Sequence, residues 1–131
     1  MKDGTDVKPA EQQEFICVAT FLPLKSWKYI IPFMMLSSKV LRQIKNSKGI
    51  ANHAVKANFA KNFFCTLSIW NDKESIRLFV PAEPHATAIK KFTQWAGDGS
   101  AFVEWTSKSM EINWPEAITR LQSPTFYYKK Q

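Results

Sequence analysis

The sequence predicts an α+β fold with the element order β-α-β-β-α-β, in which the second helix is split and a short helix follows the last strand. Two patterns lead to this prediction. Apolar runs rich in β-branched and aromatic residues recur between turn residues, and stretches with apolar residues at helical spacing separate them.

The length of the chain indicates a single domain. Its 131 residues, 45% apolar and 14% aromatic, can build one packed core. We expect a flexible N-terminal tail over residues 1–14, the domain over 15–122 and a C-terminal tail over 123–131. Residues 1–14 lack the basic start and apolar centre of a secretory signal, and no apolar stretch approaches the roughly 20 residues that cross a bilayer. We therefore expect a cytoplasmic protein without a membrane span.

The first strand and the first helix are each bounded by recognisable residues. Phe15–Leu24 is apolar on both alternating faces, as in a strand that is covered on both sides. Residues 32–46 carry apolar side chains at helical spacing with lysines and an arginine opposite them, and Pro32 is tolerated in a first turn. Gly49 then supplies a turn.

Two strands follow, Ile50–Phe59 and Asn62–Trp70, and the short connection between them predicts a hairpin. The second strand has two distinct faces. One is uniformly apolar, as in a packed core: Phe63, Cys65, Leu67 and Ile69. The other mixes aromatic and hydroxyl groups and suits a small cavity: Phe64, Thr66, Ser68 and Trp70.

The second helical region is split by prolines. Asn71 or Asp72 can cap a short helix that ends at Phe79, and Pro84 opens another helix. In that helix His85 falls on the apolar stripe, so we expect its imidazole to face inward. The stripe consists of His85, Ile89, Phe92 and Ala96.

Residues 100–106 predict the last strand, and Asn113 has capping-box spacing for a helix to about Leu121. The complete order is the ferredoxin-like pattern, with a four-stranded antiparallel sheet. Helices of this pattern cover one face of the sheet, and we expect Phe64 and Trp70 on the other. Such an aromatic patch demands a partner, so the sequence predicts a homodimer in which two sheets face each other.

Charge is unevenly distributed. The net charge is +7, and the stretch from Phe15 to Asn71 contains no acid. Its cations are Lys25, Lys28, Lys39, Arg42, Lys45, Lys48, Lys56 and Lys61. Such a field can attract phosphates, anionic lipids or acidic ligands, or can simply be a solvated surface. With a single arginine and no recognisable module, it does not predict nucleic-acid binding.

Several classes of enzyme lack their required residues. Cys17 and Cys65 match neither zinc nor redox spacing, so we expect buried thiols. With four glycines and two histidines, the chain has no phosphate-cradling loop or metal-ligand cluster. A kinase, a nucleotide-dependent dehydrogenase and a zinc hydrolase are therefore not expected.

One part of the sequence resembles the antibiotic biosynthesis monooxygenase-like families of the dimeric α/β-barrel superfamily. It is the run from Phe64 to Asp72, followed by Ser75, Ile76, Phe79 and the pair Pro84-His85. In those families a Trp ends the third strand and a Pro-His pair opens a later helical stretch. The resemblance covers roughly residues 15–121. Residues 102–105 and 114–117 look like a bacterial branch of the superfamily other than its best-studied enzymes.

The resemblance implies a dimer with a cavity between sheet and helices in each protomer. Some relatives use this cavity for cofactor-free oxygenation of aromatic substrates, and others use it for haem. The haem-degrading relatives carry an Asn on the first strand, which is missing here. Phe79 stands where their Trp is expected, and Ile89 stands near the position of their His, one turn after His85.

These observations give three functional hypotheses. The first is a homodimer that binds a small apolar or aromatic molecule, with cofactor-independent oxygenation as its expected chemistry and His85 as the best candidate for acid–base work. The second is a non-catalytic dimerisation or ligand-sensing module, and the third is a haem-binding monooxygenase. No cofactor and no metal are expected under the first. Its candidate ligand-binding residues are Phe64, Thr66, Ser68, Trp70, Phe79 and His85; His53 could also face inward.

Overall fold

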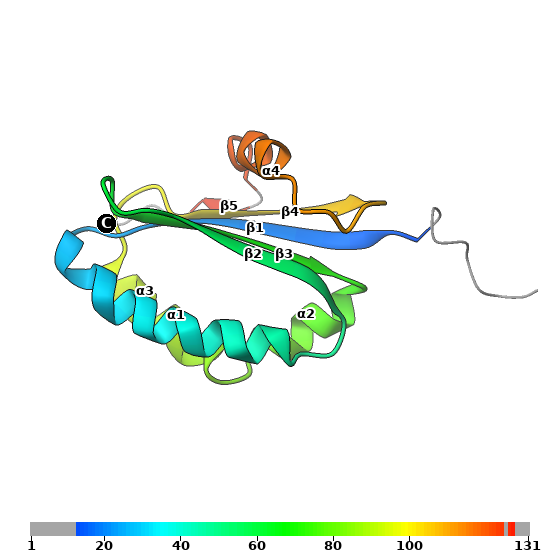
Figure 1. The fold of residues 1–131 in the computed structure, drawn as a ribbon, viewed down its shortest axis with the longest axis horizontal. Coiled ribbons are helices and arrows are strands. Elements are labelled where there is room, and N and C mark those ends of the chain that lie inside the picture. Colours follow the sequence, from blue (N-terminus) through cyan, green and yellow to red (C-terminus); the bar gives the residue numbers. More distant parts are fainter. Residues whose placement is uncertain (1–12, 125, 128–131) are drawn as a thin grey trace, which may run out of the picture.

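A computed structural model describes residues 13–124 and 126–127, and the elements follow the predicted order (Figure 1). The strands are β1 (Phe15–Pro23), β2 (Ile50–Asn58), β3 (Phe63–Trp70), β4 (Ala101–Ser107) and β5 (Phe126–Tyr127). The helices are η2 (Trp27–Tyr29), α1 (Ile30–Lys45), α2 (Lys73–Phe79), α3 (His85–Trp95) and α4 (Trp114–Leu121). The predicted ferredoxin-like α+β fold, with its split second helix and its C-terminal helix, is confirmed.

The strands form one antiparallel sheet in the order β2-β3-β1-β4-β5. Four of them are the predicted strands. The fifth, β5, adds two residues to the edge of β4, inside the range predicted as a C-terminal tail. A pairing of two residues is too short to show an alternating pattern, so nothing in the sequence marks it.

Helices cover the two faces of the sheet unequally. Helices α1, α2 and α3 lie on one side, and α4 crosses the other (Figure 1). Phe64 and Trp70 point to the side of α1–α3 and are 4% and 1% exposed. The prediction that they lie on the open face is therefore wrong. Alternation shows which residues share a face, but the path of the connections decides which face the helices cover.

Local signals explain the ends of the helices. Helix α1 begins at Ile30, two residues before the predicted start, because Pro32 in the first turn costs no intrahelical hydrogen bond. The Asp72 carboxylate accepts from the Ser75 amide at 2.8 Å and caps α2. The Asn113 side chain accepts from the Glu116 amide at 3.0 Å and caps α4. Both caps agree with the sequence prediction.

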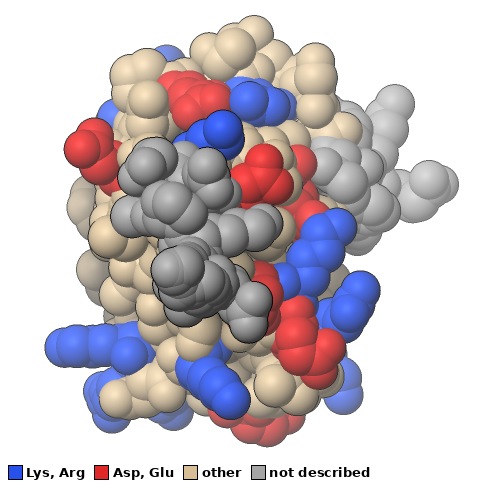
Figure 2. Space-filling view, turned by 90° about the vertical axis from the view of Figure 1, so that its right-hand side faces the viewer, with Lys and Arg blue, Asp and Glu red and all other residues tan. Residues whose placement is uncertain are grey.

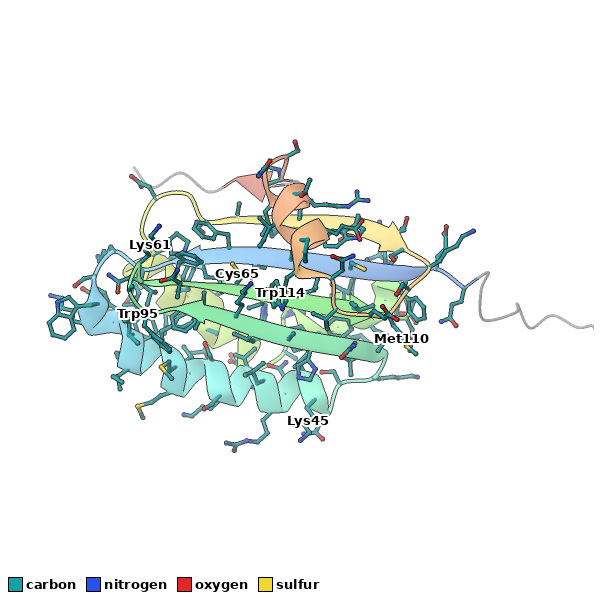
Figure 3. All side chains as sticks on the ribbon, turned by 45° about the horizontal axis from the view of Figure 1, so that its top comes forward. Lys45, Lys61, Cys65, Trp95, Met110 and Trp114 are labelled. Carbon is teal, nitrogen blue, oxygen red and sulfur yellow. The ribbon has the colours of Figure 1, made fainter. Side chains whose placement is uncertain are left out.

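On the α4 side, a core forms between the sheet and the helix. Ala117 of α4 is fully buried there, and Trp114 lies over the strands on the side away from Lys45 at the end of α1 (Figure 3). Further buried members of this core are Phe15, Cys17, Ala19, Leu67, Ile69, Val103 and Trp105. Within the described residues, no helix is long and apolar enough to cross a membrane.

Candidate functional site

The helix-facing side of the sheet is packed at its two ends. At one end Trp70 and Phe79 pack with Ile16 and Ile44, a group we call the Trp70 cluster. At the other end Phe64 packs with Leu24 and Phe33, which we call the Phe64 cluster. The rings of Phe33 and Phe64 are 4.5 Å apart. Each cluster anchors α1 to the sheet.

Polar side chains, together with Val18, Val55 and Phe102, occupy the two cross-strand rows between these clusters. His53 of β2 lies opposite Ser68 of β3, and Thr66 lies opposite Thr20 of β1, so all four share the helix-facing side. Glu104 of β4 joins the same side through its pairing with Val18. We call Thr20, His53, Thr66, Ser68 and Glu104 the polar band. All five are half-buried, in contrast to the buried aromatic residues at either end.

Hydrogen bonds hold most of the polar band in place. The Thr20 and Thr66 hydroxyl groups bond to each other across β1 and β3. The Trp70 indole Nε1–H donates to Ser68 Oγ at 2.9 Å, and Lys73 Nζ lies 3.3 Å from a Glu104 carboxylate oxygen. Each hydroxyl can both donate and accept, so the band can orient a polar substituent on a bound molecule.

An aromatic column leads from the Trp70 cluster to His85. The Trp70 and Phe79 ring centroids are 5.2 Å apart, and those of Phe79 and His85 are 4.6 Å apart. Phe79 thus contacts both rings. This arrangement places His85 beside the Trp70 cluster.

The backbone around His85 fixes its tautomer and its position. His85 Nδ1 lies 2.9 Å from the carbonyl oxygen of Val80, which can only accept, so Nδ1 carries the hydrogen. In the neutral ring Nε2 is then the proton acceptor. Gln43 of α1 accepts from the His85 amide at 2.8 Å and donates to the carbonyl oxygens of Phe79 and Ala82, both at 3.3 Å. Gln43 is therefore the positioning residue for this segment.

The six residues predicted for ligand binding divide into three groups. Trp70, Phe79 and His85 form the aromatic column, and Thr66 and Ser68 belong to the polar band. Phe64 is separate, in the cluster at the other end. On the predicted inward stripe of α3, Ala96 is buried but Ile89 is 45% exposed, because Ile89 lies at the margin of that stripe.

Sequence reasoning missed Thr20 and Glu104. Both lie in strands that the sequence predicts, on the helix-facing side of the sheet. The pairing register between the strands would have placed them in the same cross-strand rows as Thr66 and Ser68. That register depends on which residues pair across β1, β3 and β4, and alternation within one strand does not give it.

Two surface hollows lie outside the polar band. One of about 580 Å³ lies between α1 and α2, and Phe79 contributes to its floor. The other, of about 190 Å³, lies between α4 and the sheet, next to Trp105. The Trp105 indole nitrogen is buried without a hydrogen-bond partner among the described residues. Neither hollow unites the six predicted residues.

The two cysteines lie on the α4 side as buried thiols, as expected. Burial, followed by the Glu116 carboxylate, raises the pKa of Cys17 from 9.0 to about 11, and burial also raises the pKa of Cys65. Both thiols are therefore protonated near neutral pH and are poor nucleophiles. Across residues 13–124 and 126–127, no group of three His, Cys, Asp or Glu side chains could hold a metal ion.

Comparison with known proteins identifies the fold. No family model and no curated protein matches the chain. Among solved structures, a conserved protein from Methanosarcina mazei has a TM-score of 0.64 at 11% identity, over 72% of this chain and 94% of that one. An antibiotic biosynthesis monooxygenase has a TM-score of 0.62 at 10% identity, over 69% and 95%.

A third structure has a described activity. SnoaB from Streptomyces nogalater, a cofactor-independent oxygenase, has a TM-score of 0.54 at 11% identity, over 76% of this chain and 96% of that one. At such identities a likeness shows the fold and leaves the activity open. The chain therefore has the ferredoxin-like fold of the antibiotic biosynthesis monooxygenase-like proteins.

Proposed function

We propose that this protein binds a small apolar or aromatic molecule between the sheet and helices α1 and α3. The observation that carries the proposal is the half-buried polar band between two buried apolar clusters. A planar apolar body can pack against the clusters, while the Thr66 and Ser68 hydroxyl groups orient one polar substituent. This division of roles suits an aromatic molecule with one or two oxygen atoms.

Oxygenation is the chemistry we propose for this site. A phenol and dioxygen give a quinone and water, a reaction that balances without an external reductant. His85 Nε2, the unprotonated nitrogen of the neutral ring, would accept the proton of the phenol and leave an electron-rich anion. The description of SnoaB as a cofactor-independent oxygenase supports this choice, because the two chains share a fold.

A binding experiment tests the first part of the proposal. We would titrate the protein with 2-naphthol, an uncharged bicyclic phenol at neutral pH, by isothermal calorimetry. Thr66→Val removes one hydroxyl and keeps the shape, and we expect the dissociation constant to rise by about fivefold to tenfold. Thr119→Val on exposed α4 is the matched control and should leave binding unchanged. No saturable binding of 2-naphthol or of a panel of tricyclic phenols would overturn the proposal.

The His85→Ala variant tests the chemistry. Oxygen uptake with the bound phenol and the appearance of quinone absorbance would be followed for the parent and the variant. We expect the variant to bind the phenol and to lose oxygen uptake by about a hundredfold or more. If the parent binds the phenol but consumes no oxygen with any of the panel, the protein is a ligand-sensing module and the oxygenation proposal fails.

We further propose that the chain forms a homodimer through the α4 side of the sheet. Phe21 and Phe63 lie on this side, half-buried, with ring centroids 5.2 Å apart. Their exposed area is the apolar surface that a second sheet would cover. This location replaces the predicted interface over Phe64 and Trp70, which the helices already bury.

The residues at the expected haem positions do not suit haem. Ile89, near the expected ligand position, has no donor atom and is 45% exposed. Phe79, at the expected Trp position, is buried between the Trp70 and His85 rings. We therefore favour an apolar organic ligand and expect no Soret shift when haemin is added. A saturable Soret band that His85→Ala abolishes would restore the haem-binding alternative.

A further inference from the structure

The outer face of η2 and α1 exposes large apolar side chains that belong to no core. We call Trp27, Ile31, Met34 and Met35 the outer stripe. Trp27 is 74% exposed, Ile31 is 65% exposed and Met35 is 64% exposed. Each of these three residues follows the one before it by four positions in the sequence. They therefore lie along one line of the helix surface. Single exposed apolar residues are ordinary, but three in one line with Met34 beside them indicate an interaction surface.

Positively charged side chains follow the outer stripe on the same face of α1. Lys39 lies four residues after Met35, and Arg42 follows on the next turn. Both are exposed, and neither is in an ion pair with a carboxylate of the described residues. Figure 2, which views the end of the molecule where α1 ends, shows Lys and Arg side chains gathered at its lower left.

Basic residues also flank the stripe at its start. Lys25 and Lys28 lie over the Tyr29 ring, with Nζ atoms 5.5 Å and 5.4 Å from its centre. Trp27 stands between them in sequence. The whole region belongs to the acid-free stretch from Phe15 to Asn71, so no acidic side chain from this stretch offsets its charge.

We propose that the outer face of η2 and α1 docks on an anionic lipid surface. Trp, Ile and Met side chains would enter the boundary between headgroups and acyl chains, and the flanking cations would contact lipid phosphates. Figure 1 shows α1 as an outer layer of the molecule, on the side of the helices. Lys39 and Arg42 also line the hollow between α1 and α2, together with Glu83. A second copy of the chain would bring the same cations to the interface, which electrostatic repulsion disfavours.

Vesicle sedimentation tests the proposal directly. The full chain is mixed with vesicles of phosphatidylcholine alone or of equal parts phosphatidylcholine and phosphatidylglycerol, at low and physiological salt. We expect binding to the anionic vesicles that weakens as salt rises. The double variant Ile31→Ser, Met35→Ser should bind about tenfold more weakly or worse. The double variant Lys39→Gln, Arg42→Gln should lose roughly tenfold to thirtyfold.

Matched controls distinguish an effect of the outer stripe and its cations from an effect of the overall charge and hydrophobicity of the protein. Ile89→Ser removes an apolar side chain of α3 that is 45% exposed, and Lys90→Gln, Lys91→Gln removes two exposed cations of α3. We expect both controls to bind anionic vesicles like the parent. Circular dichroism melting confirms that every variant is folded.

Three outcomes overturn the proposal. The first is no binding to anionic vesicles at low salt, or binding that the stripe variants leave unchanged. The second is a change of oligomeric state in the Ile31→Ser, Met35→Ser variant by light scattering, which would mean that a second copy covers the stripe. The third is tight, stripe-dependent binding to poly-glutamate without binding to vesicles, which would mean an acidic polypeptide partner.

Discussion

Trp70 links the core of the protein to its candidate site. Its ring is 1% exposed and packs against Phe79, while its indole nitrogen donates to Ser68 Oγ at 2.9 Å. Buried tryptophans commonly need such a partner, because an unpaired indole N–H loses its hydrogen bond to water. Ser68 therefore accepts the hydrogen bond of the buried Trp70 indole and also contributes a hydroxyl group to the polar band.

The Ser68→Ala variant separates these two roles. It leaves the Trp70 indole N–H without its acceptor, so we expect the free energy of unfolding to fall by about 1–3 kcal/mol in urea denaturation. Ser38→Ala, on the exposed side of α1, is the matched control and should change stability by less than about 0.5 kcal/mol. A Ser68→Ala protein as stable as the parent would show that the bond adds nothing to stability.

The Cys17 thiol predicts a dependence of stability on pH. Its pKa is raised from 9.0 to about 11 in the folded protein, so the folded state holds its proton more tightly than the unfolded state. The resulting stabilisation is complete below pH 9.0 and is lost as the pH rises to about 11. Over this window the unfolding free energy of the parent should fall by about 2–3 kcal/mol more than that of Cys17→Ala. Parallel curves would contradict the shift.

At the scale of elements, the turn between α1 and β2 is fitted closely to α2. Gly49 has a φ of +87°, and a Cβ at this position would fall inside the Ser75 side chain. Its carbonyl oxygen accepts from the Asn71 amide at 2.8 Å, which connects the turn to the segment that leads into α2. The close packing of the α1–β2 turn against α2 therefore requires that residue 49 has no side chain.

The Gly49→Ala substitution tests this contact. Positive φ and steric overlap with Ser75 both oppose it, so we expect a loss of at least about 2 kcal/mol in unfolding free energy. Ser75→Gly removes the overlapping atoms and leaves the backbone strain. In that background Gly49→Ala should cost clearly less, and the difference measures the steric part. Equal costs in both backgrounds would assign the whole effect to the backbone.

At the scale of the whole molecule, the sheet has one side packed by three helices and one side crossed by a single short helix (Figure 1). Phe21 and Phe63 remain half-buried on the second side, where α4 does not bury them completely. The proposed ligand and the proposed dimer therefore use opposite faces of the sheet. The lipid surface would use the outside of the helical layer.

Light scattering after size exclusion tests the dimer. We expect a mass of twice 15.1 kDa for the parent chain. Phe63→Lys places a cation on the α4 side and should give a folded monomer, because burying an unpaired charge is costly. Leu78→Lys, at a residue of α2 that is 60% exposed, is the matched control and should remain dimeric. A monomeric parent, or a dimeric Phe63→Lys, would place the interface elsewhere or remove it.

The sequence was sufficient for most of the fold because its signals are local. Asp72 and Asn113 cap the helices they were predicted to cap, and the two runs around the hairpin are the strands β2 and β3. The candidate site was only partly predictable. His85 was predicted from helical spacing and Phe79 from the family resemblance, and the two do contact each other, whereas Thr20 and Glu104 reach the polar band through cross-strand pairing.

By itself, the sequence determined which residues alternate on each strand, which residues cap α2 and α4 and how the charge is distributed, since these depend on neighbours along the chain. The tertiary structure alone decided that Phe64 and Trp70 lie beneath α1–α3, and that the opposite face carries α4. The physical reason is that a strand offers two faces of equal backbone geometry. Only the packing of distant helices makes one of them the inside.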